Sequence, residues 1–139
     1  MNVDCFLDTN IFLYRASKDP ADAAKAVIAD QLIRNHRFGT SLQVAQEFYH
    51  NCRVKARLGI TQAAAEAIIT ALLRRPCVTM DERLFAEARR LCERWQLRYW
   101  DAAMLAAAGS LRARTFYSED LNDGQDYGGV VVINPFQVG

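Results

Sequence analysis

The sequence predicts an α/β protein in which helices cover both faces of a central, mostly parallel sheet. Short apolar runs that suit buried strands alternate with longer segments of helical periodicity along the whole chain. This alternation is typical of parallel sheets. The chain has 139 residues, 51% of them hydrophobic and 24% charged. These values are ordinary for a globular protein, and we expect a single domain over residues 1–139.

The charge balance excludes a uniformly basic nucleic-acid binder. Lys and Arg number 17, Asp and Glu number 16, and the net charge is +1, so any nucleic-acid site must be a local patch. No apolar run approaches the roughly 18 residues of a membrane span, and residues 1–10 lack the basic region of a signal peptide. We therefore expect a cytoplasmic protein. The cysteines expected to be buried, reduced thiols are Cys5, Cys52, Cys77 and Cys92.

The first elements are two short strands with a helix between them. Residues 3–7 form a short, mostly apolar run that suits a buried strand. After a turn at 17–20, Pro20 favours a helix start, and residues 21–35 continue as a helix. Residues 38–41 are too few for anything but a strand.

Two helices are predicted in the middle of the chain, each with a start and a stop. Ser41 can cap a helix that runs to about Leu58 and stops at Gly59. Thr61 opens a second helix, which ends before Pro76.

In the second half of the chain, the sequence predicts three more strands and two more helices. Residues 77–80 suit a strand, and the spacing of Thr79 and Glu82 is that of a capping box for a helix to about Gln96. An alanine-rich helix follows. The remaining predicted segments are that helix at 100–109, the strands at 115–118 and 130–133, and the polar loop at 119–129.

Four acidic residues are expected at one edge of the sheet. Asp8 comes directly after the first strand, and Asp120 follows the apolar run at 115–117. The carboxyl ends of parallel strands meet at one edge, where ligands bind. Glu47 borders the apolar stripe of its helix, and Asp101 opens the alanine-rich helix. We expect the four carboxylates to share one crevice.

Taken singly, each acid has an ordinary structural interpretation. Asp8 can be a helix cap or turn residue, Asp101 can complement a helix dipole, Glu47 can form a core salt bridge, and Asp120 can be a loop acid. Together they would repel one another, and no Lys or Arg is adjacent to Asp8 or Asp120. Oxygen-only donors suit Mg²⁺ or Mn²⁺, which activate water and neutralise charge on a phosphoryl group. The joint pattern favours metal-dependent phosphoryl chemistry.

Five motifs resemble those of the PIN domain family. They are LDTN at 7–10, QEFY at 46–49, YWDAAML at 99–105, YSEDLNDG at 117–124 and VVVINPF at 130–136. The resemblance spans the whole chain, and within the family the sequence is most similar to VapC-type toxins of bacterial toxin–antitoxin pairs. It implies a three-layer α/β/α sandwich and a metal-dependent endoribonuclease whose products carry a 5′-phosphate and a 3′-hydroxyl.

The resemblance also implies roles for individual residues. The implied catalytic and metal-binding residues are Asp8, Glu47, Asp101 and Asp120. The implied supporting residues are Thr9, Asn10 and Ser118. Asp8 and Asp101 would hold the first Mg²⁺ or Mn²⁺, helped by Asp120 directly or through water, and the glutamate would orient the attacking water or bind a second ion. Glu119 and Asp123 are neighbours that could replace Asp120.

The partners implied by the resemblance are an RNA substrate and a cognate antitoxin. The RNA could be tRNA, rRNA or mRNA, and the antitoxin would insert a peptide into the acidic crevice. The helix at 61–73 has apolar surface on more than one side, which suits a homodimer interface or an antitoxin groove. Packing on the preceding helix is the alternative.

Basic and aromatic residues could hold the RNA. Phosphate contact is considered for Arg53, Lys55, Arg57, Arg74 and Arg75. The arginines at 83–98 alternate with acids, which favours a self-paired, solvated helix face. Tyr99 and Trp100 could stack on bases, but we expect them to pack into the core. His36 and His50 are expected at the surface, since the chemistry requires no histidine.

Two other functions remain open, and the sequence argues against two more. The chain could be an RNA-binding PIN-like module without catalysis, although all four acids are present, or a PIN nuclease of RNA processing rather than a toxin. An aspartyl-phosphate phosphatase usually has a second Asp two residues after the strand-end Asp, and here that position is Asn10. No G-x-G-x-x-G follows the first strand, which argues against dinucleotide binding.

Overall fold

The computed structural model describes residues 3–137 and contains a five-stranded, all-parallel sheet. The strand order is β3-β2-β1-β4-β5, so the first strand lies at the centre. The strands are β1 (Cys5–Leu7), β2 (Phe38–Ser41), β3 (Cys77–Val78), β4 (Thr115–Tyr117) and β5 (Val131–Ile133).

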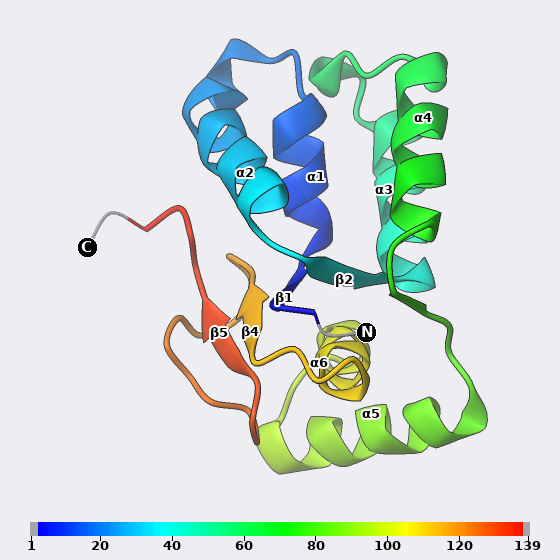
Figure 1. The fold of residues 1–139 in the computed structure, drawn as a ribbon, viewed down its shortest axis with the longest axis vertical. Coiled ribbons are helices and arrows are strands. Elements are labelled where there is room, and N and C mark those ends of the chain that lie inside the picture. Colours follow the sequence, from blue (N-terminus) through cyan, green and yellow to red (C-terminus); the bar gives the residue numbers. More distant parts are fainter. Residues whose placement is uncertain (1–2, 138–139) are drawn as a thin grey trace.

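Six α-helices cover the sheet in two layers (Figure 1). The helices are α1 (Thr9–Ala16), α2 (Ala23–Asn35), α3 (Leu42–Val54), α4 (Gln62–Leu73), α5 (Glu82–Trp95) and α6 (Tyr99–Ser110). The first four pack together on one side, and α5 and α6 pack on the other. The predicted α/β/α sandwich is therefore confirmed.

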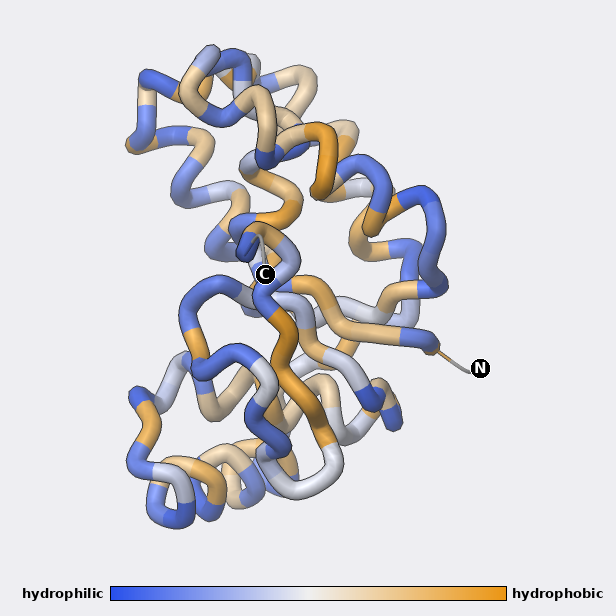
Figure 2. The backbone as a smooth tube through the Cα atoms, turned by 90° about the vertical axis from the view of Figure 1, so that its left-hand side faces the viewer, coloured by the Kyte–Doolittle hydropathy of each residue, from blue (hydrophilic) through white to orange (hydrophobic). Residues whose placement is uncertain are grey.

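The sheet is the apolar centre of the molecule. Phe6 and Phe116 lie side by side on β1 and β4, are both fully buried, and meet edge to face with ring centroids 5.2 Å apart. Figure 2 shows hydrophobic residues along the strand segments at the centre of the molecule. In the parallel register Leu7 pairs with Tyr117. The residues that follow these two strands therefore emerge next to each other.

The alanine-rich α6 lies close to the sheet, as its small side chains predict. Residues 102–108 are all buried, and the helix contacts both α5 and β2. Gly39 in β2 allows part of this close approach, because a Cβ there would come within 2.5 Å of the Leu111 side chain just after α6. This packing holds the first turn of α6 near the end of the sheet.

Several predicted helix boundaries are confirmed. The Ser41 hydroxyl accepts a hydrogen bond from the Val44 N–H at 3.3 Å, and Thr61 caps α4 in the same way. Gly59 adopts a left-handed conformation with φ of 63°, which favours glycine. It ends a short 3₁₀ turn, Ala56–Leu58, rather than α3 itself, which stops at Val54.

Other predictions are corrected. Residues 9–16 form helix α1, which is absent from the predicted elements; its consecutive apolar residues Ile11, Phe12 and Leu13 give no amphipathic period, and all three are buried. Helix α5 is capped by Asp81, whose carboxylate accepts from the Leu84 N–H at 2.8 Å, and not by Thr79.

The cysteines are free thiols, as expected, but only one is buried. Cys5 lies in the core, whereas the thiols at positions 52, 77 and 92 are half-buried. No helix in residues 3–137 is both long and apolar enough to cross a membrane.

Candidate functional site

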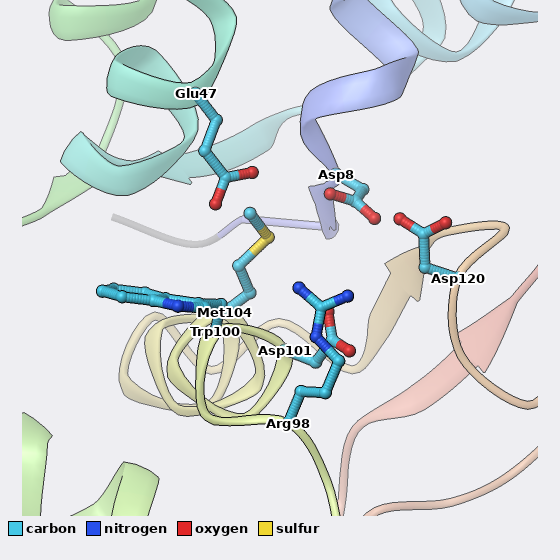
Figure 3. A pocket seen from close by; sticks show the side chains of 7 residues that line it. All are labelled: Asp8, Glu47, Arg98, Trp100, Asp101, Met104 and Asp120. Carbon is cyan, nitrogen blue, oxygen red and sulfur yellow. The ribbon is translucent and has the colours of Figure 1, made fainter. Parts of the chain in front are cut away.

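A hollow of about 310 Å³ opens at the carboxyl ends of the central strands (Figure 3). Its lining residues are Asp8, Glu47, Arg98, Trp100, Asp101, Met104 and Asp120. The structure therefore brings together all four predicted acids, which come from the end of β1, from α3, from α6 and from the loop after β4. We call this hollow the acidic pocket.

Asp8 is the most enclosed of the four acids. It is the N-cap of α1, and its Oδ1 accepts a hydrogen bond from the Thr9 N–H at 2.7 Å. Its Oδ2 accepts from the Ser118 hydroxyl at 2.6 Å. The residue is 7% exposed, and burial raises the pKa of its carboxyl to about 7, with the Ser118 hydrogen bond opposing and the Asp120 charge adding to the shift.

Ser118 links the two acids at the strand ends. Its Oγ donates to Asp8 and also accepts a hydrogen bond from the Asp120 N–H at 3.0 Å. Ser118 is fully buried, whereas Asp120 is exposed. The serine predicted as a supporting residue therefore fixes the backbone of the loop that presents Asp120.

Glu47 is held from two sides. The Thr9 hydroxyl donates to its Oε1 at 3.0 Å, and Gln43 Nε2 donates to its Oε2 at 2.9 Å. The same Gln43 nitrogen donates to the Trp100 carbonyl oxygen at 3.1 Å, which joins α3 to α6. Gln43 is absent from the predicted site residues, although its i, i+4 spacing from Glu47 on a predicted helix indicates this contact.

Asp101 lies in the first turn of α6, as predicted. Burial raises the pKa of its carboxyl. The nearby Arg98 charge opposes this shift, and the Asp120 and Glu47 charges add to it. Arg98 lines the same pocket and points into it (Figure 3). The pocket thus combines clustered carboxylates with one flanking guanidinium.

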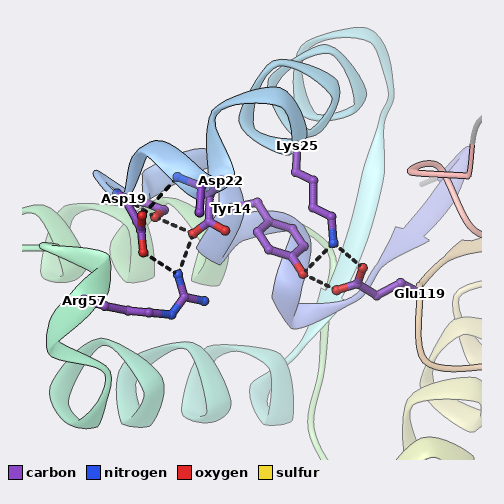
Figure 4. A network of polar contacts seen from close by, with 8 residues as sticks. Tyr14, Asp19, Asp22, Lys25, Arg57 and Glu119 are labelled. Carbon is purple, nitrogen blue, oxygen red and sulfur yellow. Dashed lines mark hydrogen bonds and ion pairs between the residues drawn. The ribbon is translucent and has the colours of Figure 1, made fainter.

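The neighbours that could replace Asp120 point elsewhere. Glu119 binds Lys25 Nζ at 2.9 Å and accepts a hydrogen bond from Tyr14, outside the acidic pocket (Figure 4). It also accepts a hydrogen bond from Asn10. Asn10 is therefore turned away from the pocket as well. Asp123 in the polar loop accepts a hydrogen bond at 2.8 Å from the N–H of Asn134, which directly follows β5.

Some of the arginines considered for RNA contact have partners within the protein. Arg57 pairs with Asp19 and Asp22, each at 3.0 Å. Arg75 lies over the Phe38 ring. On α5, Arg90 pairs with Glu87, in line with the predicted self-paired face.

The two aromatic residues that precede Asp101 differ in solvent exposure, although both were expected to pack into the core. Tyr99 is half-buried against Phe85, but Trp100 is 57% exposed and lines the acidic pocket. The expectation that Trp100 packs into the core was wrong. His50 is exposed and His36 is half-buried, and neither lines the pocket.

Comparison with known proteins identifies the family. The PIN domain profile matches residues 5–122. The chain belongs to the PIN domain family. No curated protein matches the sequence.

Two solved structures resemble this PIN domain over nearly its full length. One is described as a toxin-antitoxin complex from Klebsiella pneumoniae, with a TM-score of 0.66, 17% identity, and coverage of 96% of this chain and 99% of that one. The other is FitAcB from Neisseria gonorrhoeae, with a TM-score of 0.56 and the same identity and coverage. At this identity the likeness shows the fold alone.

The chemistry of the PIN domain's acidic pocket fits a hard divalent cation. Within residues 3–137, no three His, Cys, Asp or Glu side chains are grouped closely enough to hold a metal ion by themselves. Mg²⁺ does not need such a group, because it commonly keeps several waters and takes one or two carboxylates plus substrate phosphate. Asp120 lies close enough to Asp8 for its charge to raise the pKa of the Asp8 carboxyl.

Proposed function

We propose that this PIN domain is a metal-dependent endoribonuclease and the toxin of a toxin–antitoxin pair. The observation that carries the nuclease proposal is the meeting of four carboxylates from four separate elements in one open pocket. No described residue forms an ion pair with Asp8, Asp101 or Asp120. Folding alone gives no reason to gather like charges in this way.

Asp8 and Asp101 would hold Mg²⁺ or Mn²⁺, directly or through the ion's bound waters, and Asp120 would help in the same way, because no three carboxylates within residues 3–137 are grouped closely enough to bind one ion by themselves. Their donors are all carboxylate oxygens, which these hard ions prefer. The bound ion supplies Lewis-acid chemistry, making water a better nucleophile and neutralising charge on the phosphate. Ser118 fixes the carboxylate of Asp8 and the backbone of Asp120 in this arrangement.

Glu47 and Arg98 flank the position of the phosphodiester. Thr9 and Gln43 orient the carboxylate of Glu47, which can accept a proton from the attacking water. In the hydrolysis, the water oxygen bonds to phosphorus, the bond from phosphorus to the 3′ oxygen breaks, and that oxygen takes up a proton. The guanidinium of Arg98 can bind a phosphate oxygen as charge develops.

The toxin role is supported by the structural neighbour described as a toxin-antitoxin complex. Its match covers nearly all of both chains, so this domain has the size and fold of a member of such a complex. We extend the same inference to an antitoxin partner and a homodimer. Leu73 at the end of α4 is 48% exposed, and α4 is the candidate surface for either.

The first test is cleavage of a structured RNA pool by the purified protein with Mg²⁺, with Mn²⁺ and with EDTA. We expect metal-dependent cleavage that Asp8→Asn reduces by more than about a hundredfold, since changes to residues that merely support a metal ligand already cost about 10–100-fold. The Asn side chain can still cap α1, so the variant should fold. RNA binding without cleavage in any metal would favour the binding module.

A second test separates a toxin from an RNA-processing nuclease. Induced expression of the wild-type chain should arrest growth, and expression of Asp8→Asn at the same level should not. Cleavage in vitro without growth arrest would contradict the toxin role and leave the nuclease role intact.

A further inference from the structure

Trp100 has an exposed indole beside the acidic pocket. The residue is 57% exposed, although residues 102–108 of the same helix are all buried. The other tryptophan, Trp95, is half-buried and packs against Tyr127 with ring centroids 5.4 Å apart. A large apolar side chain left open at the edge of a polar site is a frequent feature of binding surfaces.

Contacts with neighbouring residues position both the indole ring and the backbone of Trp100. The rings of Tyr99 and Trp100 pack edge to face with their centroids 4.9 Å apart. Tyr99 also packs edge to face with Phe85, with ring centroids 5.8 Å apart. The carbonyl oxygen of Trp100 accepts a hydrogen bond from Gln43 on α3. Because both ring and backbone are already positioned, stacking of a planar group on the indole loses little conformational freedom.

A second hollow, of about 230 Å³, lies on the other side of Trp100. Its wall includes Leu42, Val78 and Met80, with the amides of Gln43 and Gln46. None of the described residues that line it is charged. It is smaller than the roughly 300–1,000 Å³ of pockets for drug-sized ligands, so it suits a single small planar group. We call this hollow the neutral groove.

Trp100 therefore separates a charged site from an uncharged one. The acidic pocket and the neutral groove share this residue as a common wall. Figure 3 shows the indole extending from α6 on the side of the pocket away from Asp120. A nucleotide has the same division, with a charged phosphate beside a planar, uncharged base whose edge can hydrogen-bond to amides.

We propose that the neutral groove binds one unpaired nucleobase of the RNA, stacked on Trp100, next to the phosphate held in the acidic pocket. The proposal rests on the proposed ribonuclease function and specifies its substrate as single-stranded at that position, because a paired and stacked base cannot enter the groove. An apolar peptide or a second copy of the chain is the competing occupant.

The test compares ligands with and without a base. Protein labelled with ¹⁵N is titrated with uridine or adenosine 5′-monophosphate and with ribose 5-phosphate, all with Mg²⁺. The indole N–H signal of Trp100 should shift with the nucleotides, while that of Trp95 serves as an internal control. We expect the nucleotides to bind about tenfold more tightly than ribose 5-phosphate, as base–aromatic stacking predicts.

Variants assign the preference to the indole. Trp100→Ala should bind nucleotide and ribose 5-phosphate alike, Trp100→Phe should keep part of the preference, and Tyr49→Ala, which removes an exposed aromatic ring outside both hollows, should keep all of it. Equal affinities in the wild type would overturn the proposal. A second result would also overturn it: Trp100→Ala changes the sedimentation coefficient of the protein but keeps the preference for nucleotide. The groove would then be covered by a second copy of the chain.

The titration involves no turnover, so the two proposals fail separately. Absence of RNA cleavage with base-dependent binding would contradict the nuclease function and leave the nucleobase site standing. Cleavage without base-dependent binding would contradict the nucleobase site and leave the nuclease function standing.

Discussion

The acidic pocket and the cluster around Glu119 use carboxylates from the same loop in opposite ways. Glu119 is bound by Lys25 and Tyr14 (Figure 4) and by Asn10. The next residue, Asp120, faces the pocket with no ion-pair partner among the described residues. In the cluster, the hydrogen bond to Glu119 raises the pKa of Lys25, so the charged pair is mutually stabilised.

The difference separates acids that support folding from acids that remain available for a ligand. A paired carboxylate already has its charge balanced and ties α1 and α2 to the loop after β4. An unpaired set raises the free energy of the folded protein until a cation enters. Two adjacent residues of similar chemistry can therefore be told apart only by what surrounds them.

Within this comparison, the largest effect on activity is expected when Asp120 and Glu119 are substituted one at a time. Asp120→Asn should reduce metal-dependent cleavage by about 10–100-fold and leave the free energy of unfolding unchanged or higher. Glu119→Gln should lower that free energy by about 1 kcal/mol with activity within a few-fold of the wild type. Cleavage kinetics and urea denaturation measure the two effects, and a reversal of the pattern would refute the comparison.

A second effect concerns the support of Glu47. Thr9→Val keeps the side-chain shape but removes the hydroxyl that donates to Glu47, so we expect kcat to fall by about tenfold with little change in KM. Thr9→Ser retains the hydroxyl and should restore the rate. Loss of kcat in both variants would indicate a packing role for the methyl group instead.

The pH dependence of the free energy of unfolding should show how far the unpaired carboxylates of the acidic pocket destabilise the folded protein. Because the folded pKa of Asp8 is about 7 and its ordinary value is 3.8, the folded state keeps a proton that the unfolded state has lost. In EDTA, stability from this group is present below about pH 4 and is lost as pH rises to about 7.

The matched variant for this effect is Asp8→Asn, which has no such proton. The difference in Tm between the variant and the wild type should grow in favour of the variant between pH 5 and pH 8. Saturating Mg²⁺ should reduce the difference at pH 8. A constant difference across this range would show that Asp8 is not the titrating group.

The smallest effect is expected in the second part of Figure 4, where Arg57 pairs with Asp19 and Asp22. Arg57→Gln should lower the urea midpoint slightly, and less than Glu119→Gln, because the guanidinium is largely solvated. RNA affinity should not change. Weaker RNA binding in Arg57→Gln than in Arg53→Gln would restore the phosphate-binding role considered from the sequence.

The sequence alone was sufficient for the fold class and for the four acids of the acidic pocket. Alternation of short apolar runs and helical periodicity determined the parallel sheet, and a parallel sheet places Asp8 and Asp120 at one edge whatever the details of the helices. The spacing of Glu47 from its apolar stripe and of Asp101 from its helix start placed the other two acids. The family motifs lie around these same residues.

Only the tertiary structure decided which polar side chains are paired and which are free. Arg57 and Glu119 find partners far away in the chain, and no local pattern specifies such contacts. The exposure of Trp100 has the same origin, since the register of α6 on the sheet sets which side of its first turn faces the core. Periodicity determines the elements because it is local, whereas ion pairing and exposure depend on how distant elements come together.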